Sequence, residues 1–105
     1  MSIRLEKPWR PRAEALQLSG QLGVFQLADI EDQVVFIGVA DARSLFGLRS
    51  AVADAFDRLT EAVRFRVEST SAYHTRYREL LMIHVADHGA LPQANPKIAL
   101  GRLHP

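Results

Sequence analysis

The sequence pattern changes three times between that of a strand and that of a helix, and this order constrains the fold most. Two stretches rich in Val, Ile and Phe, residues 23–29 and 33–40, flank a short polar turn and predict a β-hairpin. Apolar side chains then recur at three- and four-residue steps through residues 42–59, which predicts an amphipathic helix. Residues 62–69 alternate as a third strand, and residues 71–88 predict a second helix. We therefore expect an α/β (α+β) fold in the order β-β-α-β-α, with a three-stranded antiparallel sheet packed by helices.

Local signals set the expected ends of both helices. Either Asp41 or Ser44 is a candidate N-cap of the first helix. Its predicted apolar stripe consists of Leu45, Leu48, Val52, Ala55, Phe56 and Leu59. Gly89 is the expected C′ residue of the second helix. That helix has apolar residues on two sides, which predicts that it packs between layers.

A chain of 105 residues has the length of a single domain, and its apolar fraction of 48% is ordinary for a soluble protein. Residues 1–22 predict an N-terminal arm, and residues 23–105 the folded domain. Trp9 is expected to fix the arm to the domain, because a wholly exposed indole would leave a large apolar surface in water. Residues 13–20 are compatible with a short helical turn or an edge strand.

Charge and cysteine content narrow the classes of function. The net charge of +1 does not demand a polyanionic partner, although eleven of the thirteen cationic residues are Arg, which suits phosphate groups. A general preference for Arg over Lys would explain that count equally. The absence of Cys excludes disulfides, thiolate metal sites and cysteine nucleophiles. With neither a signal-peptide pattern nor an apolar run of membrane-spanning length, we expect a cytoplasmic protein without a membrane partner.

Two charged residues lie beside apolar ones on the predicted helices. Glu79 shares a side of the second helix with apolar residues. A carboxylate in such a place is expected either to have a charged or hydrogen-bonding partner or to serve in a functional site. Its simplest role is an ion pair with Arg76, three residues earlier. Arg49 borders the apolar stripe of the first helix and is either solvated or directed over the sheet.

The strings GVF and FIG occupy the two strands of the predicted hairpin, with ten residues between them. The motif positions are Gly23, Phe25, Phe36 and Gly38. With the order of elements, these strings resemble the GIY-YIG endonuclease superfamily. The resemblance extends over roughly residues 23–95 and implies a divalent-metal-dependent nuclease acting on DNA or RNA.

The resemblance also implies a set of catalytic residues. The family's helix arginine best matches Arg49 in GLRSAV, with Arg43 as a rival, and its metal-binding glutamate matches Glu79 in YRELLMIH. Asn95 in LPQANP matches an asparagine that holds the phosphate or shapes the site. Mg²⁺ or Mn²⁺ on Glu79 is the implied cofactor, since a hard cation with one carboxylate suits phosphate chemistry.

The sequence departs from the family at both motif tyrosines, which are Phe25 and Phe36 here. Phenylalanine keeps the ring but lacks the hydroxyl, and loss of an acid–base group costs about 10²- to 10⁴-fold in rate. Conceivable substitutes are Tyr73, His74, Tyr77 and His84. Two hypotheses follow: an impaired or rearranged nuclease, and an inactive scaffold that binds nucleic acid or protein. In either case a homodimer or a partner protein could supply recognition.

His84 and His88 are four residues apart on the second helix, a spacing that can hold one zinc ion. A third ligand at a recognisable spacing is absent from the sequence. Two ordinary histidines near the helix end are therefore the simpler interpretation, with His88 favourably close to the negative end of the helix dipole.

Overall fold

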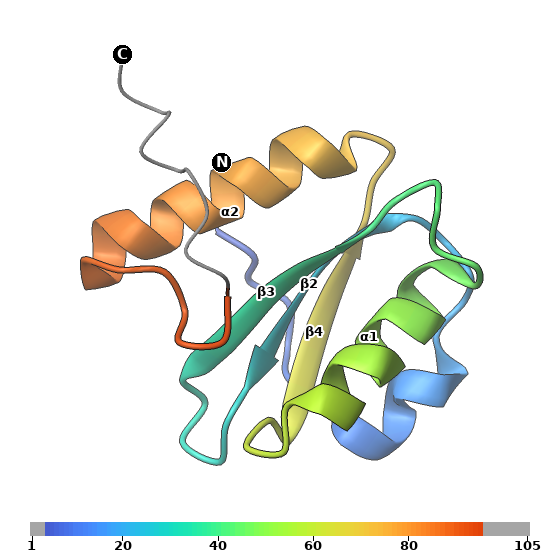
Figure 1. Ribbon diagram of the computed structural model, residues 1–105, viewed down its shortest axis with the longest axis horizontal. Coiled ribbons are helices and arrows are strands. Elements are labelled where there is room, and N and C mark those ends of the chain that lie inside the picture. The colour runs from blue at the N-terminus through green and yellow to red at the C-terminus, as the bar shows by residue number, and fades with distance from the viewer. Residues whose placement is uncertain (1–3, 96–105) are drawn as a thin grey trace.

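A computed structural model describes residues 4–95, and its central feature is an antiparallel sheet. The β2–β3 hairpin lies on one side of the sheet, and the sheet order is β1-β4-β2-β3 (Figure 1). The elements are β1 (Arg10–Pro11), the 3₁₀ helix η1 (Arg12–Gln17), β2 (Gly23–Ala28), β3 (Val34–Ala40), α1 (Gly47–Arg58), β4 (Arg64–Ser69) and α2 (Tyr73–His88). The predicted hairpin, the later strand and the two helices are confirmed as elements.

The prediction of three strands is wrong, because β1 adds a fourth strand at the edge of the sheet. Arg10 pairs with Phe65 and Pro11 with Arg64, and the Arg12 N–H then donates to the Val63 carbonyl at 3.1 Å. Proline lacks an N–H and is tolerated at such an edge. A strand of two residues is too short to show an alternating pattern, so the sequence carries no signal for it.

Helix α1 begins five residues later than predicted. Neither Asp41 nor Ser44 caps it: the preceding residue is Phe46, without a side-chain cap, and Leu45 stands 82% exposed in the loop. Gly47 has φ +56°, and a Cβ there would lie 2.3 Å from the Gly20 carbonyl oxygen. This close approach needs glycine, and it shows that the path of the loop sets the start of the helix.

Helix α2 ends as predicted but is buried on one side only. Gly89 closes the helix in the left-handed conformation at φ +79°, and its N–H donates to the Val85 carbonyl at 2.7 Å. Leu80 and Leu81 are buried, whereas Met82 is 44% exposed. The prediction that α2 packs between layers is therefore wrong, because no further layer of the described structure covers its outer side.

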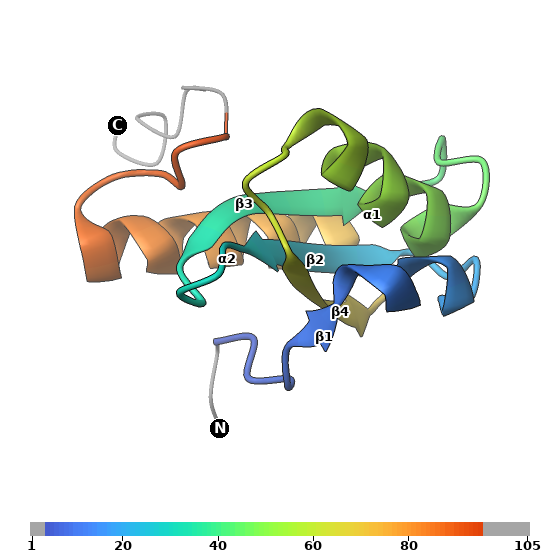
Figure 2. The same cartoon turned by 90° about the horizontal axis from the view of Figure 1, so that it is seen from below.

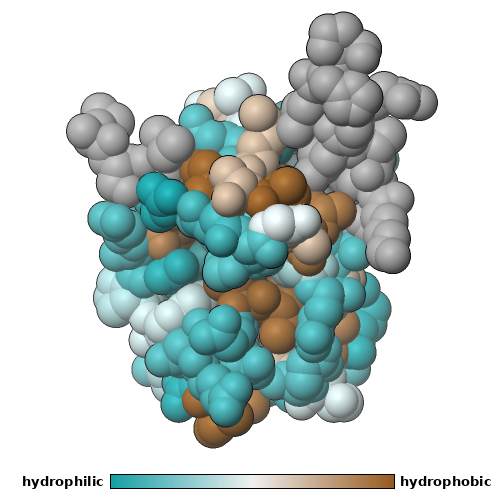
Figure 3. Space-filling model, turned by 90° about the vertical axis from the view of Figure 1, so that its left-hand side faces the viewer, coloured by the Kyte–Doolittle hydropathy of each residue, from teal (hydrophilic) through white to brown (hydrophobic). Residues whose placement is uncertain are grey.

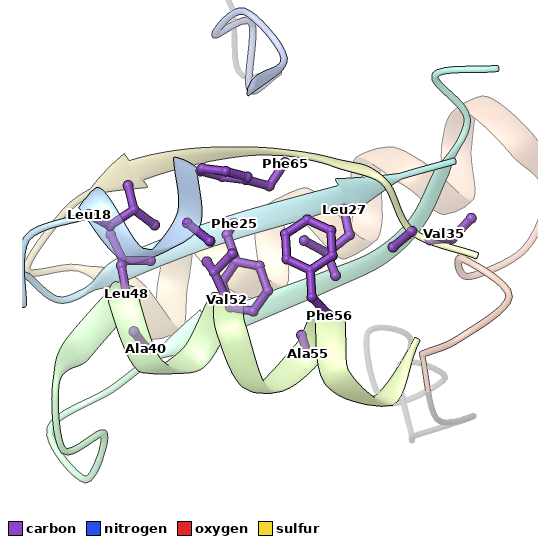
Figure 4. Packing of buried hydrophobic residues seen from close by; sticks show 12 residues of the cluster. Leu18, Phe25, Leu27, Val35, Ala40, Leu48, Val52, Ala55, Phe56 and Phe65 are labelled. Carbon is purple, nitrogen blue, oxygen red and sulfur yellow. The ribbon is translucent and has the colours of Figure 1, made fainter. Parts of the chain in front are cut away.

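The sheet lies between two layers, and each face has its own core (Figures 1 and 2). Helices α1 and η1 cover one face, where Phe25, Val52, Phe56 and Phe65 pack together (Figure 4). On the other face α2 packs on the hairpin, and Leu5 joins this second cluster at 2% exposure. Burial of these side chains provides most of the driving force for folding.

The segment predicted as an arm contributes directly to both cores. Leu5 belongs to the core under α2, and Ala15 and Leu18 belong to the core under α1. Trp9 is half-buried, and the guanidinium carbon of Arg66 lies 4.1 Å from the centroid of its ring. The indole thus contacts the sheet through a cation–π interaction.

The described helices include none that is long and apolar enough to cross a membrane. Figure 3 shows the side of the molecule at the left of Figure 1, where the C-terminal end of α2 lies. On that side apolar surface occurs in separate areas between polar residues.

Candidate functional site

The two motif glycines of the hairpin meet a steric requirement. Phe25 on β2 pairs with Gly38 on β3, and a Cβ at Gly38 would lie 2.2 Å from Cζ of the Phe25 ring. A Cβ at Gly23 would lie 2.1 Å from the Glu68 carbonyl oxygen on β4. Only a residue without a side chain fits at either place, so the GVF and FIG strings describe a packing arrangement as well as a motif.

The rings of Phe25 and Phe36 lie on the α1 face of the hairpin, with their centroids 5.9 Å apart. They help to line an open cavity of about 650 Å³ beside β3. Ala51, Asp54 and Arg58 of α1 line it as well. These three residues follow one another at steps of three and four, so the same side of the helix faces the cavity.

Tyr77 of α2 lines the cavity from the other layer, and its side chain carries a hydroxyl. Burial raises the pKa of the Tyr77 phenol, and a hydrogen bond with the Asn95 side chain acts in the opposite direction. The phenol is therefore neutral at physiological pH and suited to hydrogen bonding rather than to acting as a base. Arg58 crosses the Phe36 ring, with its guanidinium carbon 5.7 Å from the centroid.

Asn95 is buried and holds the neighbouring wall of the cavity. Its Oδ1 accepts from the Ile37 N–H at 2.9 Å, and its Nδ2 donates to the Ile37 carbonyl at 2.8 Å. The Ala94 N–H donates to the Val35 carbonyl at 2.9 Å. These hydrogen bonds join Ala94 and Asn95 to the edge of β3 that does not pair with β2. Of the two roles expected for Asn95, its contacts are those of a residue that shapes the site.

Glu79 lies away from this cavity and forms an ion pair with Arg76. The Arg76 guanidinium also binds Glu68 of β4, with Nε 2.9 Å from Oε2. The Arg76 side chain is only 13% exposed, whereas that of Glu79 is 41% exposed. Burial acts to lower the pKa of Arg76, but its hydrogen bonds to the two carboxylates outweigh this and raise it. The ion pair expected as the simplest role of Glu79 is thus present.

Arg49 is exposed, and its guanidinium carbon lies 5.1 Å from the centroid of the Phe46 ring. Its rival Arg43 is 89% exposed at the side chain and forms an ion pair with Asp41 at 3.1 Å. Among the described residues that line the cavity are Phe25, Phe36 and Gly38, but neither arginine. Neither candidate for the catalytic arginine thus contributes to the cavity beside the motif strands.

The three expected catalytic residues do not converge in the described structure: Arg49 stacks on Phe46, Glu79 binds Arg76, and Asn95 binds the backbone of β3. Within residues 4–95, no three side chains of His, Cys, Asp or Glu form a group that could hold a metal ion. A carboxylate already bound by a guanidinium does not fit the role of a free metal ligand. Metal binding by Glu79 stays a prediction, tested below.

Sequence reasoning did not select Asp54 and Arg58, which line the cavity together with Tyr77. Their spacing of four residues places them on one side of α1 and was the available signal. It became informative only once that side of α1 was known to face the hairpin. Tyr77 was one of four suggested substitutes for the missing hydroxyls, and it lies beside both phenylalanines.

His84 and His88 stack with their ring centroids 4.3 Å apart. The Nδ1 of His84 lies 2.9 Å from the Ala90 carbonyl oxygen, and burial lowers the pKa of this imidazole. Asp87, which lies between these histidines in the sequence, forms an ion pair with Arg4, with Oδ1 and Nη2 2.7 Å apart. This group ties the N-terminal arm to the end of α2.

A comparison with protein families matches the chain to a domain of unknown function, DUF7508, over residues 3–87. The chain belongs to the DUF7508 family. A comparison with curated proteins found no match. The matched part of this DUF7508 domain contains both motif strands and the cavity residues contributed by α1 and α2.

Proposed function

We propose that this DUF7508 domain is a divergent relative of the GIY-YIG scaffold that binds nucleic acid without cleaving it. The order of elements from β2 to α2 and the steric need for Gly23 and Gly38 support the relationship. At each of these glycines a neighbouring group occupies the space that a side chain would need. This arrangement is a more specific feature of the hairpin than the sequence strings alone. The motif then serves as a way of packing the hairpin rather than as a working catalytic site.

The separation of Arg49, Glu79 and Asn95 carries the proposal that cleavage is lost. Electrostatic catalysis requires groups aimed at one reacting phosphate, and here each group is engaged elsewhere. The phenylalanines at the two motif positions also lack the hydroxyls that could handle a proton. Tyr77 supplies a hydroxyl to the cavity, but its raised pKa favours the neutral phenol.

Binding of nucleic acid is favoured by the groups that do line the cavity. It combines aromatic rings, the Arg58 guanidinium and the Tyr77 hydroxyl, which are the groups that contact unpaired bases and backbone oxygens. The net charge of +1 implies few phosphate contacts, so we expect modest affinity that depends weakly on salt.

A cleavage assay tests the proposal directly. Supercoiled plasmid and short branched DNA are incubated with Mg²⁺ or Mn²⁺ and with either the native protein or Glu79→Ala. We expect no cleavage by either protein, and retained binding of labelled DNA by both in the absence of metal. Nicking that disappears in Glu79→Ala would instead establish the metal-dependent nuclease. Failure to bind any DNA or RNA would favour a protein-interaction module.

A further inference from the structure

The cavity beside β3 holds two opposite charges on one wall. Asp54 and Arg58 lie one helical turn apart on α1, and both side chains are exposed to the cavity mouth. Asp54 forms no ion pair or hydrogen bond with another residue of the described range 4–95. Arg58 contacts the Phe36 ring, and its guanidinium forms no ion pair or hydrogen bond with another residue of the described range. A carboxylate and a guanidinium that do not neutralise each other are suited to a ligand with both donors and acceptors.

The floor and the opposite wall of the cavity favour a flat ligand. Phe36 contributes its ring from the hairpin and Tyr77 contributes its ring from α2, while the Phe25 ring lies beneath the cavity surface at 2% exposure. The volume of about 650 Å³ falls within the range of small-ligand sites and is ample for one heteroaromatic base. Planar bases stack on aromatic side chains and on guanidinium planes when they are not paired in a duplex.

We propose that this cavity binds one unpaired guanine base of a single-stranded nucleic acid. The inference rests on the proposed function and adds the identity of the recognised base. A carboxylate accepts hydrogen bonds only, and guanine presents two adjacent donors, N1–H and the N2 amino group. Asp54 accepts from that edge, while Arg58 donates to O6 or N7 on the other edge. Adenine, cytosine and thymine lack this combination of paired donors and a separate acceptor edge.

The weak overall charge of the chain supports recognition of a base. Non-specific binding depends on many phosphate contacts, and a net charge of +1 provides little such attraction. Affinity must then come from contacts in the cavity. Tyr77 remains neutral and can donate its hydroxyl to the sugar or the phosphate beside the bound base.

The test uses fluorescence anisotropy with labelled eleven-nucleotide strands in EDTA, so that no metal-dependent cleavage interferes. One strand is oligothymidine, and a second carries a single central guanine. A third carries inosine, which lacks the N2 amino group, and a fourth carries 7-deazaguanine, which lacks the N7 acceptor. We expect the guanine strand to bind roughly 5- to 100-fold more tightly than oligothymidine, with intermediate affinities for the two analogues.

Variants assign each edge of the base to its side chain. Asp54→Leu should remove the difference between guanine and inosine, and Arg58→Met the difference between guanine and 7-deazaguanine, because each replacement lacks the hydrogen-bonding group. Asp57→Leu and Arg43→Met are matched controls, because both residues are exposed and neither lines the cavity. Circular dichroism establishes that each variant is folded.

Each outcome bears on one of the two proposals. Equal binding of guanine and thymine strands by the native protein would overturn the guanine site and leave nucleic-acid binding standing. A guanine preference that survives Asp54→Leu and Arg58→Met would also overturn it. If no strand binds, the proposed function fails together with the inference.

Discussion

At the scale of the residue, the motif of the hairpin is explained by contacts between side chains and backbone. The Phe25 ring occupies the space that a side chain at Gly38 would need, and the ring is only 2% exposed, so it has no room to move aside. The same ring is one wall of the cavity. Packing and ligand binding therefore depend on one pair of residues, and this pair can be tested by substitution.

Gly38→Ala should lower the free energy of unfolding by about 1–3 kcal/mol, because the new Cβ would overlap the Phe25 ring. Urea denaturation measures the change. Gly20→Ala is the control, since a Cβ there meets nothing closer than the Phe46 carbonyl oxygen at 3.5 Å. Phe25→Leu in the Gly38→Ala background should restore part of the loss in a double-mutant cycle. Equal stability of Gly38→Ala and Gly20→Ala would refute the steric explanation.

Glu79→Gln should cost at most about 1 kcal/mol, because the carboxylate is partly exposed and screened by water. Arg76→Met should cost more, since it leaves Glu68 and Glu79 without their shared cation. Thermal unfolding measures both.

The same experiment tests metal binding, since a ligand that binds only the folded state raises the melting temperature. We expect Mn²⁺ or Mg²⁺ to shift the native protein and Glu79→Gln equally. A metal-dependent rise confined to the native protein would show that Glu79 is a metal ligand after all.

At the scale of the element, strands and helices were predictable where a repeat was long enough to be seen. The hairpin follows from its two stretches rich in Val, Ile and Phe, β4 from alternation, and the C-terminal end of α2 from Gly89. The start of α1 did not, because it depends on contact between Gly47 and Gly20, which lie far apart in sequence. The position of Leu45 in the apparent stripe was coincidental for the same reason.

Asn95→Ala should destabilise the protein by about 1–3 kcal/mol, because it leaves the N–H and carbonyl of Ile37 without their partner. Hydrogen exchange of the Ile37 amide should accelerate well beyond that of amides in β2. Gln93→Ala is the control, since Gln93 is exposed and its side chain hydrogen-bonds to Glu61. Unchanged exchange at Ile37 would mean that the β3 edge is protected in another way.

At the scale of the whole molecule, the candidate site combines residues that are far apart in the sequence, from Phe25 to Ala94. Asp54, Arg58 and Tyr77 come from two helices on opposite faces of the sheet, and each side chain alone resembles an ordinary surface residue. Their proximity is a property of the tertiary structure. Residue types and family resemblance could select Phe25, Phe36 and Asn95, but not the charged residues of the cavity wall.

The packing of α2 against the N-terminal arm also predicts a dependence on pH. Burial lowers the pKa of His84 from its ordinary value of 6.5, with neighbours His88 and Asp87 acting in opposite directions. A lowered pKa in the folded state means that its stabilising contribution is present above pH 6.5. This contribution is lost as the pH falls through the folded pKa. Stability should therefore decline between pH 7 and pH 5.

Chemical denaturation at several pH values measures this slope. His84→Gln should flatten it, whereas His74→Gln, an exposed histidine on the same helix, should leave it unchanged. A slope that is identical in the native protein and in His84→Gln would assign the pH dependence to another group.

The two edges of the sheet are closed by segments from opposite ends of the described chain. Arg10 pairs with Phe65 at one edge, and Asn95 reaches Ile37 across 58 residues at the other. During synthesis the hairpin can form early from neighbouring residues, but its outer strand stays open until residue 95 has left the ribosome. The growing chain therefore passes through a period in which an unpaired strand is available to other nascent chains. Slow translation between β3 and Asn95 would lengthen that period. The yield of soluble protein should therefore fall when synthesis is slowed, even though the stability of the folded protein is unchanged.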